Sequence, residues 1–77
     1  MNGFQEQFGR REDVVATRYD DGDTVTFVAD FDGDAAVDVV DGTAIVVVGD
    51  EQFEFDLPAG DTNARANNGI VTVEVHA

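Results

Sequence analysis

The sequence predicts an all-β protein, a two-sheet antiparallel β-sandwich. Several short segments alternate apolar and polar residues, which is the pattern of a strand with one buried face. Clusters of Gly, Asp and Asn separate these segments at intervals of about eight to twelve residues, as in sandwich folds. No segment has the apolar spacing of an amphipathic helix of about ten residues or more. These observations favour strands and turns through most of the chain.

The chain of 77 residues is long enough for one small domain. We predict a flexible N-terminal arm at residues 1–12 and a single sandwich domain at residues 13–77. The arm carries Phe4 and Phe8, which would share one face if the segment were helical. Two interpretations of these rings stay open. They could dock on partner proteins, or they could pack onto the domain or lie in a disordered end.

Seven strands follow from the alternation. In the clearest of them, the apolar side chains of residues 71–75 fall on one face and the polar ones on the other. Pro58 and Gly60 break the chain before the last two strands. We predict strands at the following residues: 14–19, 25–31, 37–40, 44–48, 53–57, 64–66 and 71–75.

Two short turns define hairpins between these strands. Asp41-Gly42 lies between two apolar runs and is the strongest hairpin signal in the chain. Asn67-Asn68-Gly69 supplies residues that tolerate positive φ before the last strand. The segment at residues 44–48 is apolar on both faces, which predicts a strand that is central in its sheet or covered on both sides.

The charge is strongly one-sided. Seventeen acidic residues stand against four arginines and no lysine, and the formal net charge is −13. Such an excess repels itself in dilute salt and is screened at molar ionic strength, where the Debye length is about 3 Å. Together with the absence of serine, it predicts a halophilic archaeal protein from a salt-loaded cytoplasm. Nucleic acid is not an expected partner, because it normally requires a basic patch.

The sequence also argues against an enzyme or a metal protein. It has no Ser, Cys or Lys, and its single His76 lies beside the end of the chain. The acidic run from Asp30 to Asp41 superficially resembles a calcium loop, but Ala35 occupies the place that needs glycine and the last position is not Glu. We therefore expect no catalytic residue, cofactor or metal site. No membrane partner is expected either, because no apolar run approaches the ~20 residues of a span and no signal peptide is recognisable.

Three short motifs occur in the order found in one known family. The last begins at Leu57-Pro58, continues with Ala64, which four residues separate from the turn glycine, and ends in Gly69-Ile70-Val71-Thr72-Val73. Upstream lie Ala29-Asp30-Phe31-Asp32-Gly33 and the run from Asp41 to Gly49. From about Asp13 to Val75, the chain resembles the alpha-crystallin domain of small heat-shock proteins. It departs from that family at Asp32, where the family has Pro.

The resemblance implies a fold and a function. The fold is an alpha-crystallin-like, immunoglobulin-like Greek-key sandwich, in which strand 71–75 lies beside strand 25–31 and the Asp41-Gly42 hairpin belongs to the opposite sheet. The function is ATP-independent binding of exposed apolar or extended segments of client proteins. We predict that six residues bind clients, two from the arm and four from a groove: Phe4, Phe8, Ile45, Val47, Phe53 and Phe55.

Two features of that family have no counterpart here. Gly49-Asp50-Glu51 is too short for the long loop whose strand is exchanged between subunits, and no Ile-x-Ile anchor follows Val75. We therefore expect a monomer or a weak dimer. The alternative function is a dedicated protein-protein adaptor or regulator, similar to the CS-domain co-chaperones, that binds one partner and has no general holdase activity.

Overall fold

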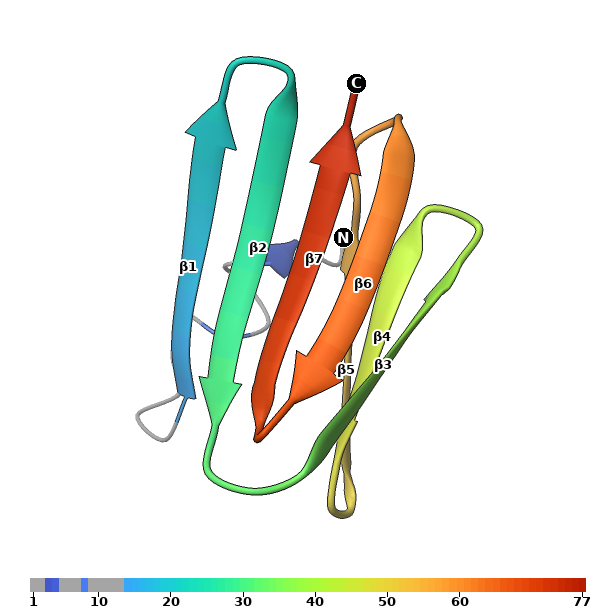
Figure 1. Cartoon of the computed structure of the whole chain (residues 1–77). Coiled ribbons are helices and arrows are strands. Elements are labelled where there is room, and N and C mark those ends of the chain that lie inside the picture. Colours follow the sequence, from blue (N-terminus) through green and yellow to red (C-terminus); the bar gives the residue numbers. More distant parts are fainter. Residues whose placement is uncertain (1–2, 5–7, 9–13) are drawn as a thin grey trace.

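Two antiparallel β-sheets make up most of the protein (Figure 1). The structure is a computed structural model that describes residues 3–4, 8 and 14–77. One sheet has four strands in the order β1-β2-β7-β6, and the other has three in the order β3-β4-β5. The strands are β1 (Val14–Asp21), β2 (Thr24–Phe31), β3 (Ala35–Val40), β4 (Thr43–Val48), β5 (Glu51–Asp56), β6 (Asp61–Asn67) and β7 (Ile70–His76).

The prediction of an all-β fold with two antiparallel sheets is confirmed. The pairing of β7 with β2 is also as expected, since Val73 lies opposite Phe27 in the register. The β3–β4 hairpin belongs to the other sheet, again as predicted. The prediction of a flexible arm over residues 1–12 falls mainly outside the described residues. Within the part of the chain that the structure describes, there is no helix long and apolar enough to cross a bilayer.

Both predicted tight turns form between adjacent strands. Asp41 and Gly42 have φ of 49° and 76°, and Asn68 and Gly69 have φ of 53° and 80°. Two successive residues with positive φ are the mark of the two-residue hairpin turn that matches the twist of its strands. The register across the first turn pairs Val40 with Thr43, so the hairpin closes without a slip.

The β6–β7 turn also contacts the connection that leads from one sheet to the other. The carbonyl oxygen of Gly69 accepts a hydrogen bond of 2.8 Å from the amide of Phe31. A Cβ added at Gly69 would lie 2.5 Å from the carbonyl oxygen of Gly33 and 2.7 Å from that of Phe31. Only glycine permits this approach of two backbones at this φ. The contact holds the end of β2 against the tip of the hairpin.

The core lies between the two sheets and is built from the inward faces of the strands. The alternation predicted for residues 25–31 and 71–75 is confirmed, because their apolar side chains point inward and are buried or half-buried. β3 packs near β6 and β7, which closes one side of the sandwich. The buried strand residues are Val14, Phe27, Ala29, Phe31, Ala44, Val46, Phe53, Phe55, Val71, Val73 and Val75.

β4 is the central strand of its sheet, which confirms the prediction of a strand that is central or covered on both sides, and Val47 is 41% exposed on its outer face. The strand bounds differ most from the prediction at β6. β6 spans residues 61–67 rather than 64–66. Its early residues Asp61, Thr62 and Asn63 are exposed and polar, and they are held by pairing with β7. Because these residues are held by backbone pairing alone, they need no alternation of apolar and polar side chains. The sequence therefore contained no pattern from which this extension could be predicted.

Candidate functional site

All six phenylalanines of the chain meet in one cluster between the sheets. Two come from β2, two from β5, and Phe4 and Phe8 come from the N-terminal segment. We call this group the phenylalanine cluster: Phe4, Phe8, Phe27, Phe31, Phe53 and Phe55. Phe4 is 6% exposed and Phe8 is 2% exposed, so both rings are as buried as the core residues of the strands. The sequence left two interpretations of these rings open, and the structure agrees with the one in which both rings pack onto the domain.

The four strand rings of the cluster form two pairs that reach across the sandwich. The ring centroids of Phe27 and Phe55 are 5.4 Å apart. Those of Phe31 and Phe53 are 5.8 Å apart, in a stacked arrangement. Aromatic pairs at such distances contribute about 0.5–1.5 kcal/mol each beyond their buried area. The two sheets are thus in direct contact through these rings.

The two N-terminal rings lie on these pairs. The ring centroid of Phe4 is 5.0 Å from those of both Phe27 and Phe55, and the rings of Phe4 and Phe55 are inclined at 71°. The ring centroid of Phe8 is 5.0 Å from that of Phe53 and 5.7 Å from that of Phe31. Each N-terminal ring therefore contacts one ring from each sheet. Both residues have helical backbone, which brings side chains four residues apart onto one face.

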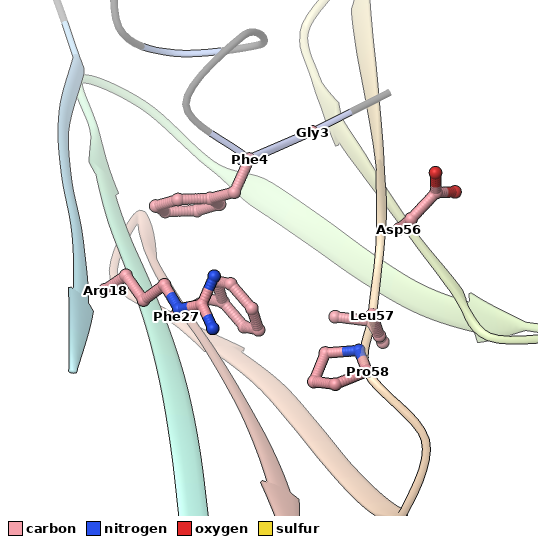
Figure 2. Close-up of a pocket in the computed structure, with 7 residues that line it drawn as sticks. All are labelled: Gly3, Phe4, Arg18, Phe27, Asp56, Leu57 and Pro58. Atoms are coloured by element: carbon pink, nitrogen blue, oxygen red, sulfur yellow. The ribbon is translucent and has the colours of Figure 1, made fainter. Parts of the chain in front are cut away.

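A pocket of about 450 Å³ adjoins Phe4 at the side of the sandwich where β1 and β2 face the end of β5. Arg18 on β1 extends its guanidinium over the ring of Phe27, 5.5 Å from the centroid, and pairs with Asp20 at 3.3 Å. Figure 2 shows Phe4, Phe27, Leu57 and Arg18 around this space, with the carboxylate of Asp56 pointing away from them. The lining residues are Gly3, Phe4, Arg18, Phe27, Asp56, Leu57 and Pro58.

A second apolar surface lies on the outer face of the three-stranded sheet. We call it the outer apolar face and define it by Ala36, Ile45 and Val47, which line a shallow pocket of about 230 Å³ together with Val37 and Asp38. In the register, Asp38 and Glu54 lie on either side of Ile45. An apolar strip with carboxylates beside it can bind an apolar segment, and it favours one whose flanks are not acidic.

The structure separates the predicted client-binding residues into two groups. Ile45 and Val47 lie on the outer apolar face, whereas Phe53 and Phe55 point inward and belong to the phenylalanine cluster. The reason is the β4–β5 register, which pairs Phe53 with Val46 and places Ile45 beside Glu54. Residues opposite one another share a face, so no single groove contains all four residues. Phe4 and Phe8 join the inner group.

The sequence reasoning did not identify the strand residues that receive the N-terminal rings. Phe27 and Phe31 lie on the apolar face of strand 25–31, but nothing in the alternation indicated that Phe4 and Phe8 would cover them. The sequence reasoning did not point to a pocket either, because Arg18 was not singled out and Leu57-Pro58 entered only as part of a motif and as a break in the chain. The available signal was that Arg18 falls on the same face of its strand as Val14 and Ala16, since a long cationic side chain can lay its apolar stem on apolar surface and keep its charged head in water.

The described charged residues lie at the surface. No polar or charged side chain is buried among the described residues. The ion pairs described are Arg18 with Asp20 and Arg65 with Glu74, at 3.3 and 3.1 Å. Such exposed pairs contribute little to stability. Within residues 3–4, 8 and 14–77, no group of His, Asp and Glu side chains is placed to hold a metal ion.

These features define a small, acidic, all-β domain with a buried aromatic cluster. Residues 1–75 match a family of unknown function, DUF7127, and the chain therefore belongs to this family. Neither the curated proteins nor the solved structures contain a match to the chain.

Proposed function

We propose that the protein is an ATP-independent, chaperone-like module that binds exposed apolar or extended segments of client proteins. The observation that carries this proposal is the outer apolar face, where the central strand β4 presents Val47, which is 41% exposed, beside the half-buried Ile45. An antiparallel sheet that packs one face on the core normally has polar residues on its other face. Exposed apolar side chains at the centre of a sheet are typical of a surface that binds another protein.

The resemblance to the alpha-crystallin domain is part of this proposal. Its support is the strand order, because β7 lies between β2 and β6 while the β3–β4 hairpin belongs to the other sheet. That is the arrangement that the resemblance implies. Among the described residues, the outermost strands are β1 and β6 in one sheet and β3 and β5 in the other. An extended segment can bind to a sheet by adding to an outermost strand as a new strand.

The surface can be tested with substitutions that keep strand propensity. Ile45→Thr combined with Val47→Thr removes apolar groups from the outer apolar face, and Thr is as well suited to strands as Val. The matched control is Val15→Thr, since Val15 is 69% exposed on β1 of the other sheet. Binding of a permanently unfolded, fluorescently labelled client is followed by anisotropy in molar KCl. The two substitutions remove three methyl or methylene groups at about 0.8 kcal/mol each, so we expect about fiftyfold weaker binding for the double variant and no change for the control. Equal affinity of all three proteins would refute the assignment of this surface.

A second candidate is an adaptor or regulator that binds one dedicated protein. The observation that favours it is the short connection from β4 to β5, made by Gly49 and Asp50 with Gly49 at a φ of 58°. This connection has no segment that could be exchanged between subunits, and general holdases usually present many copies of a weak surface. A pull-down from lysate in molar salt distinguishes the two candidates. Many partners support the chaperone-like module, and one stoichiometric partner supports the adaptor.

We also propose that the protein acts in a salt-loaded cytoplasm, as part of a halophilic archaeal proteome, and that its partners are proteins. The support is the net charge of −13 together with the exposure of the described charged residues. A surface of this charge repels phosphate backbones and attracts counterions instead. The proposed function requires no cofactor, no catalytic residue and no metal.

A further inference from the structure

We propose that the phenylalanine cluster contains a second binding site, occupied in this structure by the chain's own Phe4 and Phe8. The site takes client segments that carry two aromatic side chains four residues apart with basic residues beside them. This inference rests on the proposed function and assigns it an additional surface and a class of ligand. We call the rings of Phe27, Phe31, Phe53 and Phe55 the aromatic floor.

The aromatic floor is held together without the N-terminal rings. Phe27 contacts Phe55 and Phe31 contacts Phe53 directly across the two sheets. Both sheets are also fixed by their own ladders and by the contact of Gly69 with Phe31. Exchange of the N-terminal rings for other aromatic rings therefore leaves the strand framework intact.

The N-terminal rings bind this floor as a ligand binds a groove. Phe4 contacts one cross-sheet pair, Phe27 with Phe55, and Phe8 contacts the other. These contacts of the two residues with the strands are contacts of ring on ring, within a core cluster that also contains aliphatic side chains. A short helical segment that lays two side chains of one face into an apolar groove is a common mode of peptide recognition. The same contacts are available to any segment with this spacing.

The sequence of the chain's own ligand indicates the charge of the segments that fit. Arg10 and Arg11 follow Phe8 after one intervening residue, Gly9, and are two of only four arginines in a protein with a net charge of −13. The strand that carries Phe53 and Phe55 also carries Glu51, Glu54 and Asp56. Opposite charges on ligand and site favour encounter and exclude wrong partners. An aromatic pair beside basic residues is therefore the ligand class.

An empty site is unfavourable, so the N-terminal rings leave only in exchange for a ligand. With Phe4 and Phe8 absent, four aromatic rings would face water, and a chain of this size tolerates little such exposure. The pocket of about 450 Å³ beside Phe4 gives an incoming side chain a place to enter before Phe4 has left. A segment tethered to its own site has an effective concentration in the millimolar range. A free ligand of equal intrinsic affinity must therefore reach about the same concentration to displace half of the tethered segment.

A single tryptophan at position 4 can report the exchange. The chain contains no Trp, and the pocket next to Phe4 has room for the larger ring of Phe4→Trp. The full-length variant in molar KCl is titrated with a peptide of the sequence of residues 1–12, and with the same peptide in which both phenylalanines are alanine. The control variant is Tyr19→Trp, at an exposed position on the four-stranded sheet that carries Phe27.

We expect the first peptide to shift the tryptophan emission to the red, with half-saturation at about millimolar concentration, while the far-ultraviolet circular dichroism of the strands is unchanged. The alanine peptide and the Tyr19→Trp variant should give no shift. Absence of a shift with the first peptide, an equal shift with both peptides, or loss of strand signal along with the shift would each overturn the inference.

If Phe4→Trp does not fold, the amide chemical shifts of Phe27 and Phe55 in the wild-type protein are followed with the same two peptides. Shifts with the first peptide alone support the site, and unchanged shifts reject it.

A second arm separates this inference from the proposed function. The Phe4→Trp variant is mixed with an unfolding client, and light scattering and tryptophan emission are recorded together. Suppressed aggregation with a red shift supports both the second binding site and the chaperone-like function. Suppressed aggregation with unchanged emission means that clients bind elsewhere, so the inference fails and the proposed function stands. Failure of suppression together with a red shift from the peptide leaves the site supported and rejects the chaperone-like function.

Discussion

Phe8→Ala should remove most of the stability of the domain. The side chain of Phe8 is 2% exposed, and its ring lies 5.0 to 6.0 Å from those of Phe31, Phe53 and Phe55. Truncation of a buried Phe to Ala costs about 3–5 kcal/mol, because the apolar contacts are lost and a cavity is left. A domain of this size has only about 3–5 kcal/mol available. The variant is therefore expected to be largely unfolded, or to melt about 15–30 °C lower, at 4–8 °C per kcal/mol.

The assay is thermal and urea unfolding followed by far-ultraviolet circular dichroism in molar KCl. Tyr19→Ala is the matched control, because it also truncates an aromatic ring on the four-stranded sheet, but at a position that is 58% exposed. Surface substitutions of this kind change stability by about 0.5 kcal/mol or less. Equal unfolding midpoints for Phe8→Ala and Tyr19→Ala would refute the argument, since the N-terminal rings would then contribute nothing to the core.

Three further predictions concern the backbone, the charge and the oligomeric state. Gly69→Ala should lower the urea midpoint more than Gly49→Ala. Both glycines have positive φ, which costs about 1–2 kcal/mol for alanine, but only at Gly69 would the new Cβ meet backbone oxygens, at 2.5 and 2.7 Å. The melting temperature should rise steeply from dilute buffer to molar KCl, because salt screens the repulsion of a net charge of −13; a flat profile would mean that the acidity serves solubility alone. Light scattering coupled to size exclusion in molar salt should give a monomer or a weak dimer, and a large shell of many subunits would contradict the short Gly49-Asp50 connection.

Sequence reasoning succeeded where one local pattern determines the structure. The alternation from Val71 to Val75 sets the buried face of β7, and the Asp41-Gly42 turn requires the positive φ that both residues adopt. It failed where the structure depends on which strands meet. The resemblance to the alpha-crystallin domain predicted one groove that contains Ile45 and Phe53, but the register puts Glu54 beside Ile45.

The N-terminal segment illustrates the same limit at the candidate site. The spacing of Phe4 and Phe8 shows that they can share a face, and the sequence therefore left two destinations open. The structure has them on the aromatic floor, with one ring from each sheet against each of them. Only the packing of β2 over β5, which is a contact distant in sequence, brings those rings together. No local period in the chain could indicate it.

Suppression of client aggregation tests the central claim most directly. A model client is unfolded in molar KCl without ATP, and its light scattering is followed with increasing amounts of the wild-type protein. We predict that scattering falls progressively and is strongly reduced at several-fold excess, and that Ile45→Thr with Val47→Thr weakens the effect while Val15→Thr does not. Scattering that stays at the level of the client alone at several-fold excess would contradict the proposed chaperone-like function.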